Sequence, residues 1–370
     1  METLKPAGKN VLDTRHFDEI HFWCCMTPLS YLKAPFWVLG LAGTDKSPRK
    51  NPLLGSERLN TWGLHKKRVQ LAADLAAHRR AKLAHLVDRD QQAFFDENGY
   101  FLVKNFLPEE TFRQLKEEVF NQPFESREMR QGQAVTRMTL LPPEVLRKNA
   151  ALAQAVRDPR AINMIRYAAS QGGQPLNFIQ TVLVEPLKVK KKDPQSDAHA
   201  DTFHATSKAW LFLQDVGEDD GPFFFVPGSH KLTKERLEWE YECSLSAAKD
   251  LRSHHASGSF RIKADELASL GLPQPKKMAV PENTLIVADT FAFHGRTPSD
   301  KPTVRSEIHW HMRRNPFLPW TGGDLKSMPG LKDRGMPVLM DLADVAEKTL
   351  KQRNVWRKVG EVMVRSQPHV

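Results

Sequence analysis

Hydrophobic positions follow two different spacings along this chain. Before residue 170 and after residue 340 they recur every three or four residues, which is typical of helices with one buried face. Between these regions they form short runs separated by Pro and Gly, without the regular strand–helix–strand succession of a parallel sheet. This pattern predicts an α+β, mainly β fold: a jelly-roll barrel (double-stranded β-helix) with flanking helices and a helical N-terminal extension.

The runs also locate the individual elements. Helices are expected over residues 63–89, 91–98, 108–120, 151–170 and 341–364, with Gly99 ending the second of them. Strands are expected over residues 100–103, 176–186, 208–216, 221–229, 280–289 and 303–312. Residues 123–150 are charged and are expected to be irregular, whereas 231–277 are polar and helix-like and are expected to form an insertion that covers the site.

A His-x-Asp motif lies between two of the expected strands. On extended backbone His199 and Asp201 point to the same side, so they offer a nitrogen and an oxygen ligand to one metal ion. The third ligand must come from elsewhere, and His294 is the candidate. The alternatives to His294 are His230, His309 and His311, and His204 is an alternative to His199. Two histidines and one carboxylate are the facial triad of non-haem iron oxygenases, which leaves coordination positions open.

Further motifs surround this pair. They are Gln92–Leu107, Gly221-Pro222 with Pro227-Gly228-Ser229-His230, Ala288-Asp289-Thr290 with His294-Gly295, and Arg305. With them the chain resembles the phytanoyl-CoA dioxygenase family of iron(II)- and 2-oxoglutarate-dependent oxygenases, over roughly residues 90–317. The spacing from His294 to Arg305 matches that family, and no rival histidine is followed by an arginine at the same interval.

The resemblance implies a set of roles. His199, Asp201 and His294 would bind Fe(II), and Arg305 would bind the distal carboxylate of the cosubstrate 2-oxoglutarate. Polar residues on neighbouring strands would line the cosubstrate pocket, and those proposed are Gln180, Thr181, Thr290 and Ser306. Trp210 either faces this pocket or packs in the core. The implied reaction uses O2, hydroxylates an unactivated C–H bond and releases succinate and CO2; the carboxylate of Asp201 favours hydroxylation over halogenation.

Composition and charge restrict the partners. The 370 residues carry a net charge of +10, which favours an anionic substrate or surface. The three cysteines include the adjacent Cys24 and Cys25, which indicates a reducing compartment rather than a disulfide framework. No signal peptide or membrane-spanning run is expected, so the predicted location is cytoplasmic, and a peripheral position on the inner face of the membrane is the alternative. Nucleic acid is not an expected partner, because no recognised module is present.

We divide the chain into an N-terminal extension (1–89), an oxygenase domain (90–317) and a C-terminal tail with a basic helix (318–370). The aromatic run 21–43 and the basic helix 63–89 suit an anionic membrane surface, or alternatively pack on the barrel. The expected substrate is therefore a lipid or glycolipid, for example a lipopolysaccharide sugar, and the basic run 188–192 is a further candidate contact for an anionic substrate. The alternatives are a hydroxylase of an acyl-CoA or small metabolite, and a non-catalytic metal-binding barrel.

Overall fold

The computed structural model describes residues 28–184, 193–299, 301–323, 327–328 and 333–370. The first part of the predicted membrane-contact run, 21–27, and the basic run 188–192 lie outside the described residues. The helices are α2 (Pro28–Leu41), α3 (Glu57–Thr61), α4 (Leu64–Lys82), α5 (Arg89–Asn98), α6 (Glu109–Phe120), α7 (Pro143–Lys148), α8 (Ala150–Arg157), α9 (Pro159–Ala169), α10 (Lys234–Ser246), α11 (Ser253–Ala256), α12 (Ala264–Ser269) and α13 (Gly335–Leu350). The strands are β1 (Tyr100–Val103), β2 (Pro123–Gln131), β3 (Ala134–Thr139), β4 (Leu176–Val184), β5 (Ser207–Phe212), β6 (Phe223–Phe225), β7 (Lys276–Lys277), β8 (Leu285–Asp289), β9 (His294–Arg296), β10 (Thr303–Met312) and β11 (Arg357–Met363).

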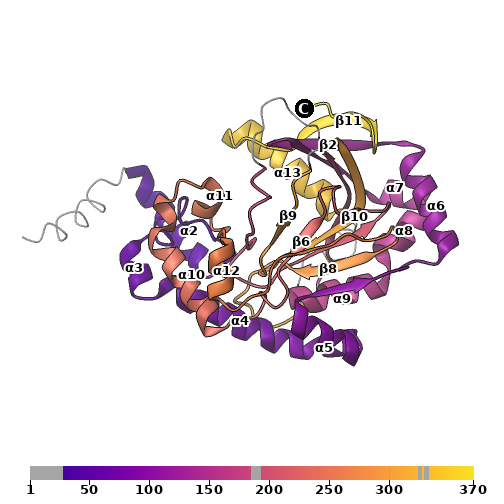
Figure 1. Cartoon of the computed structure of the whole chain (residues 1–370). Helices are drawn as coiled ribbons and strands as arrows, with labels where there is room; N and C mark the ends of the chain where they lie inside the picture. Colours follow the sequence, from indigo (N-terminus) through magenta and orange to yellow (C-terminus); the bar gives the residue numbers. More distant parts are fainter. Residues whose placement is uncertain (1–27, 185–192, 300, 324–326, 329–332) are drawn as a thin grey trace, which may run out of the picture.

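Two antiparallel sheets form the body of the protein. The large sheet of the described chain has eight strands in the order β1-β8-β5-β10-β4-β3-β2-β11, and the small one has the order β7-β6-β9. Figure 1 shows the large sheet beside a group of helices formed by α2, α3 and α10 to α12, with α4 passing from this group toward α5. The predicted α+β, mainly β class is confirmed, with helices flanking a barrel of antiparallel strands.

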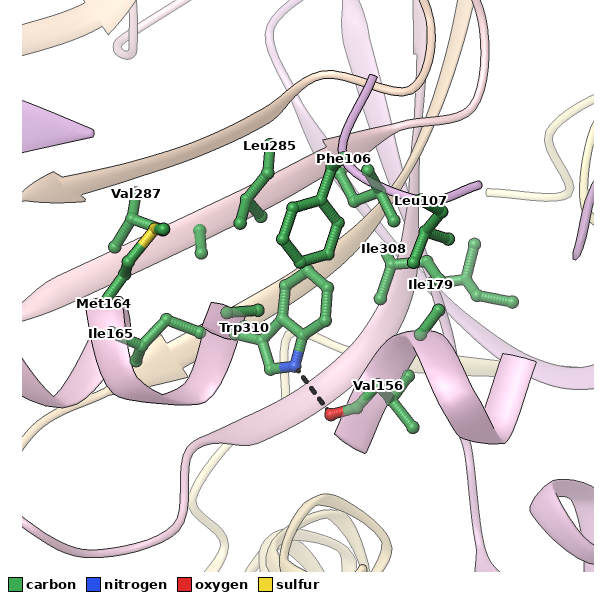
Figure 2. Close-up of a cluster of buried hydrophobic side chains, with 14 of the residues drawn as sticks. Phe106, Leu107, Val156, Met164, Ile165, Ile179, Leu285, Val287, Ile308 and Trp310 are labelled. Carbon is green, nitrogen blue, oxygen red and sulfur yellow. Dashed lines mark hydrogen bonds between the residues drawn. The ribbon is translucent and has the colours of Figure 1, made fainter. Parts of the chain in front are cut away.

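Strand β10 separates the hydrophobic core from a polar interior. Ile308 and Trp310 point to the helix-covered face, where the Trp310 indole donates to the Val156 carbonyl at 3.3 Å (Figure 2). Arg305 and His309 point to the opposite face and line a cavity. Because side chains alternate along a strand, one ten-residue strand serves the core and the site together.

The region 123–150 is not irregular, contrary to the prediction: it forms the hairpin of β2 and β3, followed by α7. Its charged residues are the reason that the sequence pattern did not indicate strands. Arg137 and Glu128 are fully buried and form an ion pair of 2.5 Å. The Arg137 guanidinium also donates to the carbonyls of Met363 and Val364, so the C-terminal segment is needed to satisfy it.

Other boundaries also differ from the prediction. The expected helix 341–364 is α13 followed by β11, which pairs with β2 at the edge of the large sheet. In the segment between α13 and β11, the side-chain oxygen of Asn354 accepts a hydrogen bond from the backbone N–H of Trp356. The expected helix 151–170 is divided into α8 and α9, because Pro159 has no N–H to continue a helix and begins a new one instead.

Helix α4 begins where expected but ends at Lys82, and its arginines are not a free basic face. Arg79 is buried and donates to the carbonyls of Ser170, Pro316 and Leu318. Arg80 forms an ion pair of 3.2 Å with the buried Asp289. These contacts favour the alternative in which this part of the extension packs on the barrel.

Candidate metal centre and adjoining cavity

Backbone pairing brings the two predicted histidine ligands together. His199 lies opposite His294, at the start of β9, in an isolated antiparallel bridge. Each residue donates its N–H to the carbonyl of the other, at 3.0 Å. The two imidazole rings consequently lie with their centres 4.7 Å apart.

Asp201 completes the group from the same segment as His199. Its N–H donates to the Thr290 carbonyl at 2.9 Å, which fixes the backbone beside the end of β8. Its Oδ1 atom lies 3.8 Å from the Nε2 atom of His199 and 3.6 Å from that of His294. One ligand atom from each of the three residues lies within 4.8 Å of the others, a separation that one metal ion can bridge.

Hydrogen bonds orient both imidazoles for metal binding. His199 Nδ1 lies 2.7 Å from the Asp197 carbonyl, and His294 Nδ1 lies 2.9 Å from the Ala292 carbonyl. A proton on Nδ1 leaves the lone pair of Nε2 free to bind a metal ion. The buried Nε2 atom of His294 has no hydrogen-bond partner among the described residues. Burial lowers the pKa of His199 well below its ordinary value, so its ring stays neutral, as a metal ligand must. These features fit an iron(II) ion.

Two lysines contact Asp201, and neither was among the predicted site residues. Lys208 on β5 places its ammonium 2.6 Å from Oδ2, and Lys46 of the N-terminal extension donates to the Asp201 backbone carbonyl. Burial opposes ionisation of Asp201, but Lys208 and the two histidines hold the pKa of its carboxyl well below the ordinary value. The strand pattern could have indicated Lys208, which shares a face with Trp210, whereas nothing in the sequence indicated Lys46.

A cavity of about 210 Å³ adjoins the triad between the two sheets. Its described lining consists of Met129, Gln131, Thr136, Gln180, Gln195, Lys208, Trp210, Phe212, Phe223, His294, Gly295, Arg296, Arg305, His309 and Trp356. Three of these carry a positive charge and none is Asp or Glu. Each of the three is also ion-paired, Lys208 with Asp201, Arg296 with Asp193 and Arg305 with Glu307. The cavity therefore offers an anionic occupant charged N–H donors rather than a large excess of positive charge.

Arg305 and Gln180, two of the predicted cosubstrate contacts, both lie in this lining. The Arg305 guanidinium donates from Nη1 to the Gly221 carbonyl at 2.6 Å and from Nε to Glu307 at 3.3 Å. Gln180 donates to the other oxygen of Glu307 at 2.8 Å. Glu307 is buried behind these two side chains, where it fixes their orientation.

Three other predicted residues, Thr181, Ser306 and Thr290, are placed differently. Thr181 lies on the opposite face of β4 from Gln180, and its hydroxyl is 3.1 Å from that of Ser306, so neither hydroxyl reaches the cavity. The Thr290 hydroxyl lies 2.7 Å from that of Thr206 and is also outside the lining. Thr290 instead acts through its backbone carbonyl, which accepts the N–H of Asp201.

The rival histidines are not part of the triad. His309 lines the cavity beside Trp210, and Trp210 belongs both to this lining and to a buried hydrophobic cluster. His204 and His230 are enclosed elsewhere, and burial lowers the pKa of each to about 3. The lining from β2, β3 and Trp356 was not foreseen, because those segments were not predicted as strands facing the site.

Residues 95–263 match the profile of the family described as phytanoyl-CoA dioxygenase (PhyH), a range that includes His199 and Asp201 but ends before His294 and Arg305. No curated protein matches the sequence.

Similar solved structures include HygX from Streptomyces hygroscopicus with nickel and 2-oxoglutarate bound. It is 16% identical in sequence, the alignment covers 66% of this chain and 94% of HygX, and the TM-score is 0.39. The epimerase SnoN from nogalamycin biosynthesis has 17% identity, 65% and 92% coverage and TM-score 0.39. The carbocyclase SnoK from the same biosynthesis has 18% identity, 68% and 90% coverage and TM-score 0.38. Over residues 95–263 this chain is therefore similar to the phytanoyl-CoA dioxygenase family.

Proposed function

We propose that this enzyme hydroxylates an unactivated C–H bond of an anionic substrate, with 2-oxoglutarate and O2 as cosubstrates and succinate and CO2 as products. One observation carries the proposal: the His199–Asp201–His294 group adjoins a cavity lined by the N–H donors of Lys208, Arg296 and Arg305. Similarity to an enzyme family over residues 95–263 disfavours the alternative of a non-catalytic metal-binding barrel.

Each residue has a definite task in this proposal. The two histidines bind the ion through Nε2, and Asp201 binds it through Oδ1 while Lys208 holds Oδ2. An aspartate bound through one oxygen leaves more of the coordination sphere open than one bound through two. When bound, Fe(II) supplies the oxygen chemistry, and the protein supplies orientation and exclusion of water.

Arg305 is proposed to bind the distal carboxylate of 2-oxoglutarate. Its guanidinium is already oriented by Glu307 and by the Gly221 carbonyl, so little conformational freedom is lost on binding. Gln180 adds a polar side chain to the same part of the cavity. Thr290 supports the ligand Asp201 from its backbone, and for Thr181 this geometry offers no role in binding.

The finer proposal is that the substrate is a lipid or glycolipid met at an anionic membrane surface. Helix α2 exposes Phe36 and Leu39, each about 70% accessible, together with Val38 and the basic Lys33. Apolar side chains beside basic ones favour such a surface. Across the part of the chain that the structure describes, no helix has the length and hydrophobicity to cross a membrane.

A small anionic metabolite is the second candidate substrate. The cavity of about 210 Å³ is smaller than most pockets for large ligands, and Gln131 and Thr136 make its lining near β2 and β3 polar. A soluble acyl-CoA would have to leave most of its length outside this space.

The function is tested by measuring succinate formed from 2-oxoglutarate with Fe(II) and ascorbate. Wild type is expected to form succinate, and His199→Ala is expected to lose this activity. His254→Ala is the matched control, because His254 is half-buried on the insertion and outside the triad. Equal activity in wild type and His199→Ala contradicts the proposal.

The membrane proposal needs a test on the full chain, because Arg80 and Lys46 join the extension to the site. A Phe36→Asp, Leu39→Asp double variant is expected to lose sedimentation with phosphatidylglycerol vesicles. Leu251→Asp, at an exposed leucine of the insertion, is expected to retain it. Absence of vesicle binding in wild type would leave the small metabolite as the preferred substrate.

A further inference from the structure

Helix α13 has an apolar face that no described residue covers. Met336 and Met340 are buried on its inner side, against a cluster that includes Phe178. On its outer side large apolar residues are 40–66% exposed, namely Val338, Leu339, Leu342, Val345 and Leu350. A contiguous exposed face of this kind marks an interaction surface.

The outer residues follow the spacing of a helix-pairing seam. Val338, Leu342, Val345 and Thr349 are separated by four, three and four positions, which places them on one stripe. Leu339 flanks the stripe on one side. Asp341 and Lys348, about two helical turns apart, flank it on the other side.

We propose that α13 pairs with α13 of a second copy of this chain, antiparallel and about a two-fold axis. An axis between Leu342 and Val345 sets Leu342 against Val345 of the second copy, and the same contact recurs by symmetry. It also brings Asp341 near Lys348 of the second copy, again twice. The interface thus combines an apolar seam with two complementary ion pairs.

The charges favour this arrangement over others. In a parallel pair, Asp341 and Lys348 of one copy would face the flank formed by Leu339 and Ala346 of the other copy. That flank offers neither of them an oppositely charged side chain. An anionic membrane is also disfavoured, because α13 carries Asp341, Asp344 and Glu347 against the single basic residue Lys348.

The proposed interface is connected to the cavity. Asp344, on the inner side of α13, accepts hydrogen bonds from Arg127 at 2.6 and 2.8 Å and from Asn354 at 2.9 Å. Asn354 in turn holds the backbone of Trp356, which lines the cavity. Pairing of the two helices would therefore also support this wall of the site.

The test measures the mass of the full-length protein by light scattering during gel filtration. Wild type is expected to be a dimer, and Leu342→Asp is expected to be a monomer with an unchanged circular dichroism spectrum. Leu71→Asp, at a half-exposed leucine on α4, is the matched control and should remain dimeric. A monomeric wild type overturns the proposal, whether or not the protein binds vesicles.

Charge exchange tests the antiparallel geometry. Lys348→Asp places two acids together at each end of the seam, and we expect dimerisation about tenfold weaker. Adding Asp341→Lys restores opposite charges and should recover the wild-type dissociation constant. If the double variant is no tighter than Lys348→Asp alone, the proposed two-fold pairing is wrong.

Discussion

Single residues decide how Asp201, a proposed metal ligand, is oriented. Its two carboxylate oxygens have different environments: Oδ1 faces the histidines and Oδ2 is held by Lys208 at 2.6 Å. Residues that orient a ligand in this way affect metal binding without touching the metal. Lys208 is therefore the first position at which the geometry can be tested beyond the triad.

We expect Lys208→Met to weaken Fe(II) or Co(II) binding by about tenfold or more, because changes to residues that orient ligands typically have this effect. Anaerobic titration calorimetry measures the affinity directly. Lys277→Met, at an exposed lysine of β7 paired with the surface residue Glu218, is the control. Unchanged affinity in Lys208→Met would show that Asp201 is oriented without the lysine.

Arg305→Lys is expected to raise the KM for 2-oxoglutarate by about tenfold or more. Lysine keeps the charge but cannot make the two parallel hydrogen bonds of a guanidinium, and hydrogen bonds to charged groups contribute about 1.5–3 kcal/mol. The matched control is Arg296→Lys, whose parent guanidinium lines the same cavity and pairs with Asp193 at 2.8 Å, closer than the 3.3 Å between Arg305 and Glu307. A larger effect at Arg296 would assign the carboxylate to that residue instead.

Gln180 and Thr181 show what sequence can and cannot predict at this scale. The strand that carries both was predicted, and alternation along it means that only one of the two can face the cavity. Which one does so depends on pairing with β10, where Gln180 lies opposite Glu307 and Thr181 opposite Ser306. That register is a property of the assembled sheet.

At the scale of elements, the turn after α5 combines two constraints. Gly99 has φ of +85° at the end of the helix, and a Cβ added there would lie 2.5 Å from Nδ1 of His230. We expect Gly99→Ala to lower the free energy of unfolding by about 2–4 kcal/mol, from the left-handed backbone and the steric overlap together.

Urea denaturation compares this variant with Gly271→Ala. Gly271 also has a positive φ, +67°, but an added Cβ would meet no atom within 4 Å. The control should therefore lose only the backbone part, about 1–2 kcal/mol. Equal losses in the two variants would show that packing against His230 contributes nothing.

The ion pair between β2 and α13 predicts a pH dependence. Hydrogen bonds from Arg127 hold the pKa of Asp344 well below its ordinary value. A carboxyl with a depressed folded-state pKa stabilises the fold above its unfolded pKa, about 3.9, and loses that contribution as the pH falls through the folded value. Asp344→Asn should thus lower the melting temperature at pH 7, and the difference from wild type should shrink at pH 3. A difference that grows on acidification would contradict this assignment.

The β2–β3 hairpin explains why this part of the sheet was not predicted. Charged residues in alternation are normally exposed, so Glu128 and Arg137 did not indicate strands. Their burial depends on pairing with each other and on carbonyls from residues 363–367, more than two hundred positions away. Helix α6 and strand β1, whose apolar spacing is local, were predicted correctly.

At the scale of the whole molecule, segments outside the matched family range complete the site. The N-terminal extension contributes Lys46, which contacts Asp201. The C-terminal segment contributes Trp356 to the cavity and β11 to the large sheet. The predicted division at residues 89 and 317 stays a proposal about boundaries. The contacts show that a barrel cut at these points would lose part of its active-site wall.

The central claim is that His199, Asp201 and His294 bind one metal ion to which 2-oxoglutarate then binds. Anaerobic calorimetry of the full-length protein, titrated first with Fe(II) and then with 2-oxoglutarate, tests it most directly. We predict one Fe(II) per chain in wild type and binding of 2-oxoglutarate that requires the metal, with both greatly weakened in His294→Ala. Undiminished binding of Fe(II) and 2-oxoglutarate by His294→Ala would contradict the account, because the third ligand would then be a different residue.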